Sequence, residues 1–260
     1  MKSQKIFLGT NLKMYKNIKD TISYLSDLTM KTKDISREKF ELFVIPSFTS
    51  LSEASKVVNK NLIKLGAQNM YWEEQGQFTG EISPLMLQEL DIDIIQIGHS
   101  ERRHVFGEND DDENKKVICA LNHNFTVLLC VGETLAQKNY NVSNEVLRMQ
   151  LKIDFSGVPK KNIDKIRVAY EPVWAIGVNG IPASIEYVTE KQGVIKDTLV
   201  EIFGEDGRQI PVLYGGSVNT NNANDLIKMP NVDGLFIGRS AWDARSFNKI
   251  IREVLLLTTL

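Results

Sequence analysis

Short apolar runs alternate with longer amphipathic stretches along the whole chain. Runs that are apolar at nearly every position are typical of strands buried on both faces of a parallel sheet, whereas apolar residues at helical spacing predict the helices between them. The expected strands are residues 5–11, 42–46, 62–68, 94–99, 127–133, 167–171, 211–215 and 234–238. The expected helices include residues 18–31, 51–59, 144–153, 185–203, 221–228 and 246–257.

Eight strand candidates, most of them followed by a helix, predict an α/β fold: a (β/α)₈ barrel forming one domain over residues 1–260. An open doubly wound sheet is the alternative, but it usually has fewer strands and often a G-x-G-x-x-G motif after the first. Neither that motif nor G-x-x-x-x-G-K-[ST] occurs in the chain. In a barrel, active sites form at the carboxyl ends of the strands, so the candidate residues are those at the end of each run.

Composition and charge narrow the functional classes. Charged residues make up 25% of the chain and hydrophobic residues 42%, as in ordinary soluble domains. The formal net charge of −2 provides no broad basic field for nucleic acid or a membrane surface, so an anion must be held by a local site. The sequence has no membrane span, signal peptide or disulfide framework, and its two cysteines, Cys119 and Cys130, form no zinc motif. A cytoplasmic protein is expected.

Two side chains at the ends of apolar runs can transfer protons. Glu171 ends the sixth run beside apolar Trp174 and Ile176, and a carboxylate shielded from water suits a general base. His99 ends the fourth run, and we expect Ser100 to cap the following helix. A histidine at a helix N-terminus is kept neutral and can donate a hydrogen bond to a substrate oxygen. Taken alone, an ion-paired glutamate and a core histidine satisfied by backbone groups are the alternatives.

Two glycine-bearing loops are suited to a phosphate. Residues 214–217 (YGGS) can turn tightly with converging backbone N–H groups, and residues 234–240 (GLFIGRS) place further N–H groups after the eighth run. The loops after strands 7 and 8 of barrels commonly hold a phosphate. Lys13, just past the first run, adds a cation. Singly these features are ordinary turns and a surface lysine; together they predict a local anion site.

Seven segments resemble the triosephosphate isomerase family, in order along nearly the whole chain. They are residues 11–14, 66–69, 78–83, 98–103, 130–133, 169–177 and 214–217, of which GHSERR at 98–103 and YEPVWAIG at 170–177 are highly specific. The resemblance implies an aldose–ketose isomerase that interconverts dihydroxyacetone phosphate and glyceraldehyde 3-phosphate of glycolysis and gluconeogenesis through an enediol. A glutamate base, a neutral histidine and a closing loop belong to that family's chemistry. No metal and no organic cofactor are implied.

The resemblance assigns a role to each candidate residue. Glu171 takes the proton from the carbon next to the carbonyl, while His99 polarises the carbonyl and moves protons between the two enediol oxygens. Lys13 stabilises the enediolate and the phosphate. The other assigned positions are Asn11 as a further donor, Glu101 and Ser100 as supporting residues, and Gly177, Ser217, Gly238 and Arg239 as phosphate ligands through their N–H groups.

A lid and a homodimer are also implied by the resemblance. The lid excludes water, so that the enediolate does not eliminate its phosphate. In the family a loop, here residues 69–81, reaches the neighbouring site, with Thr79 near Asn11 and Lys13. The lid residues are Pro172, Val173, Trp174, Ala175, Ile176, Gly177, Val178, Asn179 and Gly180.

Three segments depart from the usual pattern of that family. The lid continues as AIGVNGIPAS over residues 175–184 without the usual hinge, Arg239 stands where a second glycine is usual, and the first loop has Leu12 and Tyr15. The lid and eighth-loop forms resemble the branch that isomerises a four-carbon ketose phosphate, L-erythrulose 1-phosphate, in erythritol breakdown. The Arg239 guanidinium either binds phosphate or points to solvent.

Two other functional classes are alternatives. A barrel that no longer catalyses would be a binding protein, although Lys13, His99 and Glu171 all stand where the chemistry requires them. A different barrel enzyme, such as a phosphosugar epimerase, would need metal ligands or paired acidic residues, and no His-rich cluster supplies them. The sequence therefore favours an isomerase of a small phosphorylated sugar.

Overall fold

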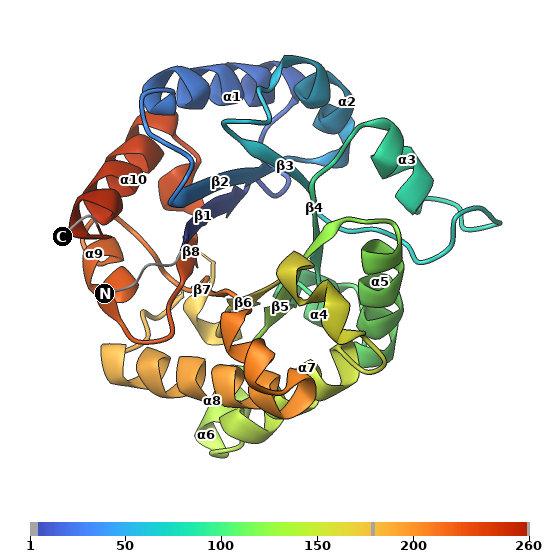
Figure 1. The fold of residues 1–260 in the computed structure, drawn as a ribbon, viewed down its shortest axis with the longest axis vertical. Helices are drawn as coiled ribbons and strands as arrows, with labels where there is room; N and C mark the ends of the chain where they lie inside the picture. The colour runs from blue at the N-terminus through green and yellow to red at the C-terminus, as the bar shows by residue number, and fades with distance from the viewer. Residues whose placement is uncertain (1–4, 178–179, 259–260) are drawn as a thin grey trace.

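A closed barrel of eight parallel strands forms the centre of the molecule, as the sequence predicts (Figure 1). The computed structural model describes residues 5–177 and 180–258. Each strand pairs with the next in the chain, and β1 pairs with β8 to close the barrel. The strands are β1 (Ile6–Asn11), β2 (Phe40–Ile45), β3 (Lys64–Ala67), β4 (Ile94–Ile97), β5 (Thr126–Val131), β6 (Ile166–Tyr170), β7 (Val212–Tyr214) and β8 (Gly234–Phe236).

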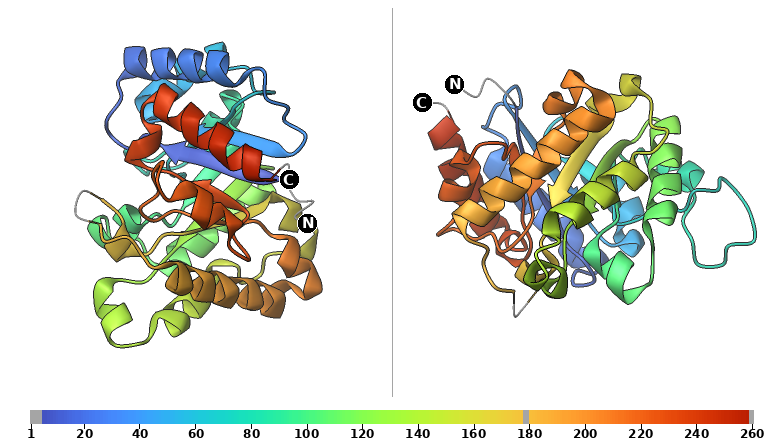
Figure 2. Two further views of the ribbon diagram at one scale, coloured as in Figure 1. Left: turned by 90° about the vertical axis from the view of Figure 1, so that its left-hand side faces the viewer. Right: turned by 90° about the horizontal axis from the view of Figure 1, so that it is seen from below.

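Helices form a ring around the strands, as Figures 1 and 2 show. The range of α8 (Ile185–Phe203) agrees with the prediction, and its cap is Ser184, which accepts a hydrogen bond from the Tyr187 N–H. The other predicted helices correspond to α1 (Ile18–Thr32), α2 (Phe48–Val57), α7 (Ser143–Asp154), α9 (Ala223–Lys228) and α10 (Ala244–Thr258). Further helices are α3 (Pro84–Glu89), α4 (Ser100–Val105), α5 (Asp110–Asn122) and α6 (Leu135–Asn139), with 3₁₀ turns η1 (Lys160–Lys165), η2 (Val173–Ala175), η3 (Glu205–Gln209) and η4 (Arg239–Ala241).

Helix α5 is absent from the predicted set because its first turn carries little apolar signal. That turn is Asp-Asp-Asp-Glu, and a capping box between Asn109 and Asp112 fixes its start. Acidic side chains at a helix N-terminus are stabilised by the dipole and by free N–H groups. Helix formation here is therefore carried by capping and charge rather than by hydrophobic periodicity.

The core has an inner and an outer layer. Side chains that point into the barrel form the smaller one: Phe7, Phe43, Ile45, Ile94, Leu128, Cys130, Ala169, Leu213 and Phe236. A side chain at Gly9 would overlap the ring of Phe43, so glycine is what lets this ring fill the interior. The larger layer lies between strands and helices. Burial on both faces explains why the strands read as continuous apolar runs.

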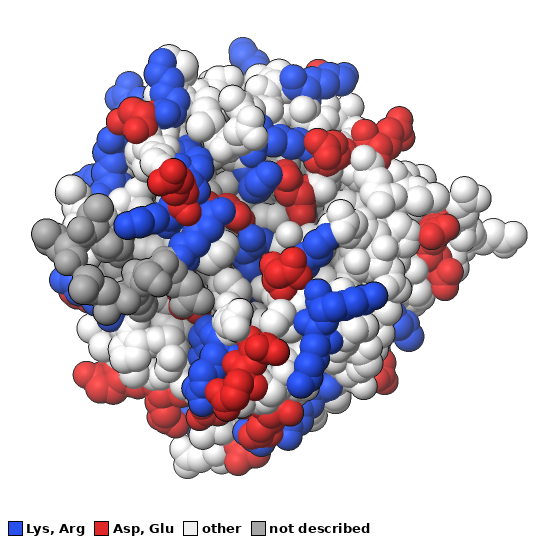
Figure 3. Space-filling model, in the orientation of Figure 1, with Lys and Arg blue, Asp and Glu red and all other residues white. Residues whose placement is uncertain are grey.

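Charges of both signs are interspersed over the face shown in Figure 3, which looks along the barrel in the same direction as Figure 1. No broad field of one sign covers this face. Across the described residues, none of the helices is both long enough and apolar enough to cross a membrane.

Candidate active site

Three side chains predicted from the sequence meet at the carboxyl end of the barrel. Glu171 follows β6 directly, whereas His99 and Lys13 lie two residues beyond the ends of β4 and β1. Glu171 and His99 are 5% and 4% exposed, and 3.7 Å separates Nε2 of His99 from Oε2 of Glu171. The fourth predicted strand, residues 94–99, is longer than β4, because the chain leaves the barrel at Gly98 with a positive φ of 73°.

The Glu171 side chain is held by close packing. A methyl group on Gly215 would lie 2.6 Å from Cγ of Glu171, so the carboxylate arm rests directly on this glycine. Cys130 lies close to this carboxylate, and burial together with the Glu171 charge raises the pKa of its thiol well above the usual value. Oε2 of Glu171 accepts no hydrogen bond from the described residues. A buried carboxylate oxygen without a donor is ready to accept a proton from a ligand.

His99 itself caps helix α4, so the expectation that Ser100 is the cap is wrong. The Glu101 backbone N–H donates to Nδ1 of His99 at 3.1 Å, and Ser100 is the first residue of the helix. Because a backbone N–H can only donate, Nδ1 is the acceptor and the proton of the neutral ring lies on Nε2. The ring therefore presents an N–H donor toward Glu171 and the mouth of the barrel.

Lys13 is fixed by hydrogen bonds at both of its ends. Its backbone adopts a φ of +50°, and its N–H donates to Oδ1 of Asn11 at 2.7 Å. Its ammonium group lies 2.6 Å from Oε1 of Glu101, the position expected to support it. Gln68 donates to Oδ1 of Asn11 and to the Lys13 carbonyl, both at 2.9 Å. The strained turn thus holds a cation at the rim of the barrel.

Gln96 is a site residue that the sequence analysis did not select. It is fully buried in β4, where Oε1 accepts from Nδ2 of Asn11 at 2.9 Å and Nε2 donates to Sγ of Cys130 at 3.4 Å. It connects the residue beneath Lys13 with the cysteine beside Glu171. The available signal was a single polar residue inside the apolar run Ile94–Ile97.

The two glycine loops lie at the carboxyl ends of β7 and β8, as predicted. Gly216 packs against the hydroxyl of Tyr214, and the space beside Gly238 is open. Among the residues described, no acceptor is paired with the N–H groups of Ser217, Gly238 or Arg239. Backbone N–H groups without an acceptor at such loops suit an anion.

The start of the predicted lid is tied to a buried glutamate. Oε1 of Glu133 accepts hydrogen bonds from Nε1 of Trp174 and from the hydroxyl of Tyr187, both at 2.8 Å, and Tyr170 donates to the same carboxylate. Burial and the Glu133 charge raise the pKa of the Tyr170 hydroxyl, which therefore remains a donor. The ammonium of Lys138 lies 3.6 Å from the centre of the Trp174 ring. Two of the predicted lid residues, Val178 and Asn179, lie outside the described residues.

Residues 69–81 form a loop that projects from the barrel, as Figures 1 and 2 show. Stacking of Tyr71 on Trp72, with ring centres 4.1 Å apart, and of Tyr71 on Phe78 at 4.5 Å stiffens it. Thr79 is exposed near its tip. This shape is suited to contact with another molecule.

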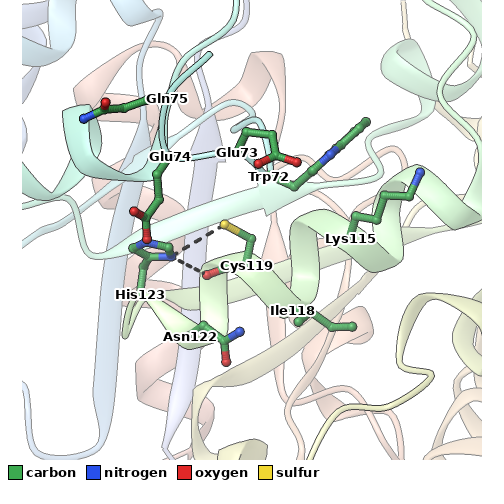
Figure 4. Close-up of a pocket in the computed structure, with 9 residues that line it drawn as sticks. All are labelled: Trp72, Glu73, Glu74, Gln75, Lys115, Ile118, Cys119, Asn122 and His123. Atoms are coloured by element: carbon green, nitrogen blue, oxygen red, sulfur yellow. Dashed lines mark hydrogen bonds and ion pairs between the residues drawn. The ribbon is translucent and has the colours of Figure 1, made fainter. Parts of the chain in front are cut away.

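An open hollow of about 710 Å³ lies beneath this projecting loop (Figure 4). His123 faces Glu74 of the loop at 2.9 Å and the Cys119 carbonyl of α5 at 2.9 Å, so both ring nitrogens are engaged. Burial, with Glu74 and Glu73 nearby, raises the pKa of the Cys119 thiol to about 11, which makes it a poor nucleophile. Within the described ranges no cluster of three or more His, Cys, Asp or Glu residues could hold a metal ion. His123 therefore links the projecting loop to α5.

Comparisons with known proteins agree with this geometry. A family model described as triosephosphate isomerase matches residues 6–254. A protein of Rhizobium etli described as L-erythrulose-1-phosphate isomerase is 44% identical over 96% of this chain and 92% of its own length. A Brucella abortus protein with the same description is 41% identical over 95% of both chains. The crystal structure of a triosephosphate isomerase from Bartonella henselae superposes with a TM-score of 0.86 at 32% identity, covering 96% of this chain and 98% of that one.

Proposed function

The chain belongs to the triosephosphate isomerase family, and from that premise we propose that its substrate is L-erythrulose 1-phosphate. It is an isomerase of either a triose phosphate or a tetrulose phosphate. The relatives described as acting on the tetrulose share more sequence with it than the solved triosephosphate isomerase does. The unusual lid sequence and Arg239, both at the mouth of the barrel, favour the same substrate.

The observation that carries the proposed chemistry is Oε2 of Glu171, which has no hydrogen-bond partner among the described residues, beside the neutral His99 ring. In L-erythrulose 1-phosphate the phosphate is on C1, the carbonyl on C2 and a hydroxyl on C3. Glu171 takes the proton from C3 while the Nε2–H of His99 donates to the C2 oxygen, which gives an enediol. His99 transfers protons between O2 and O3, and Glu171 returns its proton to C2.

The product of this sequence carries its carbonyl on C3, and no atom is gained or lost. Because C3 bears the C4 hydroxymethyl group, the product is again a ketose phosphate. With dihydroxyacetone phosphate the reacting carbon bears two hydrogens, and the same transfer gives an aldose. One set of groups therefore performs either reaction, and the substrates differ only in the substituent on the reacting carbon.

The remaining polar groups are proposed to hold the charges of the substrate. Lys13 stabilises the enediolate and the phosphate, with Asn11 as a neighbouring donor and Glu101 fixing the ammonium. Ser100 supports His99 by beginning the α4 helix. The proposed phosphate ligands are the N–H groups of Gly177, Ser217, Gly238 and Arg239.

The lid is proposed to exclude water from the enediolate. Its first residues, Pro172 to Ile176, contain a 3₁₀ turn whose Trp174 side chain is bound to Glu133. A rigid first hinge lets a loop move as one body. Exclusion of water prevents loss of the phosphate from the intermediate.

We also propose a homodimer formed through the projecting loop, residues 69–81. Met14 is 95% exposed beside Lys13, and Phe78 is 41% exposed on the loop. Apolar side chains at these two places match a contact in which the loop of one subunit covers the rim of the other. Thr79 would then lie near Asn11 and Lys13 of the partner.

The substrate is tested by following the loss of substrate signals and the growth of product signals by ¹H NMR, with L-erythrulose 1-phosphate and dihydroxyacetone phosphate in parallel samples. The product signals report every turnover, whether or not the transferred hydrogen exchanges with solvent. We expect kcat/KM for the tetrulose to exceed that for the triose by roughly 10- to 200-fold, the discrimination that one carbon provides. An equal or greater rate with the triose would make the protein a triosephosphate isomerase.

A further inference from the structure

Arg239 reaches from the eighth strand to the lid. It begins η4, just beyond β8, and its Nη2 donates to the Gly177 carbonyl at 3.0 Å, across 62 positions of the chain. The sequence alone left this guanidinium either on a phosphate or in solvent. In the structure it contacts a lid residue instead.

Among the described residues Arg239 has no acidic partner, unlike two other cations at this end of the barrel. Lys13 is paired with Glu101 at 2.6 Å, and Arg103 with Asp154 at 2.7 Å. Over residues 5–177 and 180–258, no carboxylate lies within ion-pair distance of Arg239. A cation without a partner beside free N–H groups attracts an anion, and a dianion most strongly.

The Arg239 side chain links two parts of the proposed phosphate site. The N–H groups of Gly238 and Arg239 lie on one side, and Gly177 of the lid lies on the other. A guanidinium has five N–H donors in a planar fork that matches phosphate oxygens, and the bond to Gly177 uses one of them. The remaining donors can bind phosphate while the contact with the lid persists.

We propose that the Arg239 guanidinium is a side-chain ligand of the substrate's phosphate that also ties this phosphate to Gly177 of the lid. Its ligand class is a phosphate monoester dianion. The inference rests on the proposed function in one respect, that the substrate is a sugar phosphate. It adds a side-chain cation to a site that would otherwise bind phosphate through backbone N–H groups and Lys13.

Binding of inorganic phosphate, measured by isothermal titration calorimetry, tests the inference without turnover. Arg239→Met removes the charge and keeps the side-chain length, whereas Arg239→Lys keeps the charge without the fork. The matched control is Arg208→Met, an exposed arginine of η3 paired only with Glu205. We expect Arg239→Met to raise the phosphate Kd by roughly 10- to 100-fold, Arg239→Lys to raise it less, and the control to leave it within about twofold.

Steady-state kinetics with L-erythrulose 1-phosphate supply the second readout. We expect Arg239→Met to raise KM by a similar factor with a smaller change in kcat, since a phosphate contact acts on substrate and transition state alike. A phosphate Kd unchanged in Arg239→Met, or no phosphate binding by the parent protein, overturns the inference. If phosphate binding depends on Arg239 but neither sugar phosphate is turned over, the proposed function fails and the inference stands.

Discussion

Nε2 of His99 and Oε2 of Glu171 lie 3.7 Å apart, too far for a hydrogen bond and close enough to face one small ligand. The proton of the neutral ring is on Nε2, because Nδ1 accepts from the Glu101 N–H. A donor and an unpartnered acceptor therefore point into the same space. A carbonyl oxygen on one side and an acidic C–H on the other would satisfy both.

Replacing Glu171 with Gln should lower kcat by roughly 10²- to 10⁴-fold, the range for loss of a general base. Gln has almost the same shape, so the packing on Gly215 and the melting temperature should change little. The measurement is turnover of both sugar phosphates, followed by the growth of product signals in ¹H NMR, with circular dichroism as the check on folding. Glu186→Gln, an exposed change at the start of α8, is the matched control. Near-normal turnover in Glu171→Gln would remove this residue from the role of base.

The protonation of His99 can be observed directly. ¹⁵N NMR of the histidine side chains at pH 7.5 should show a neutral ring for His99 with its proton on Nε2, because the Glu101 N–H occupies Nδ1. The three histidines are assigned by single replacements, His99→Gln, His104→Gln and His123→Gln. His99→Gln should also lower kcat by roughly 10²- to 10⁴-fold. A proton on Nδ1 in the folded protein would contradict the arrangement described here.

The barrel was predictable because a parallel strand that is buried on both faces is apolar at consecutive positions. The ends of those runs also located Lys13, His99 and Glu171. The contacts that hold these residues were not predictable in the same way, because they depend on which side chains the closed barrel brings together. Gln96 is an example, since closure of the barrel brings its amide from β4 to Asn11 of β1, a strand with which β4 does not pair.

The cap of helix α4 shows a second limit. Serine is a strong N-cap residue, so sequence preference favoured Ser100. The structure places the cap one position earlier, because Nδ1 of His99 reaches the Glu101 N–H. The contact between Arg239 and Gly177 shows the same limit over a long range, since no local pattern relates two residues 62 positions apart. Residue types at single positions indicated the chemistry, whereas contacts between residues far apart in the chain became known only from the fold.

Gly215→Ala tests whether packing on this glycine aims Glu171. The added methyl group would lie 2.6 Å from Cγ of Glu171, so the carboxylate must shift. Because a misplacement of about 1 Å costs roughly 10²-fold in rate, we expect turnover to slow by roughly 10- to 100-fold while the fold is retained. Gly193→Ala is the matched control, because its methyl group would meet nothing closer than 4.0 Å in the middle of α8. Equal turnover rates in both variants would show that Glu171 is positioned by other contacts.

The buried Glu113 side chain should make the folding stability of the protein depend on pH. Its side chain is 0% exposed, neither carboxylate oxygen has a hydrogen-bond partner among the described residues, and Lys116 is 4.0 Å away and bound to Glu108 at 2.6 Å. Burial, the largest cause, raises the pKa of Glu113 from 4.5 to about 7, and the Glu108 charge adds to this. The folded state therefore binds this proton more tightly than the unfolded state does. Stability from this group is complete below pH 4.5 and is lost as the pH rises through 7.

Glu113→Gln should remove this loss, because Gln resembles the protonated acid at every pH. The measurement is the free energy of unfolding in urea at pH 5 and at pH 8, at fixed protein concentration. The decrease between these two pH values should be about 3 kcal/mol smaller in the variant than in the parent. Glu108, whose pKa ion pairing lowers to about 2, titrates below this window. Glu145→Gln, an exposed acid in the first turn of α7, matches the helix position and should keep the parent's pH dependence. A parent-like slope in Glu113→Gln would mean that Glu113 is ionised in the folded protein throughout this range.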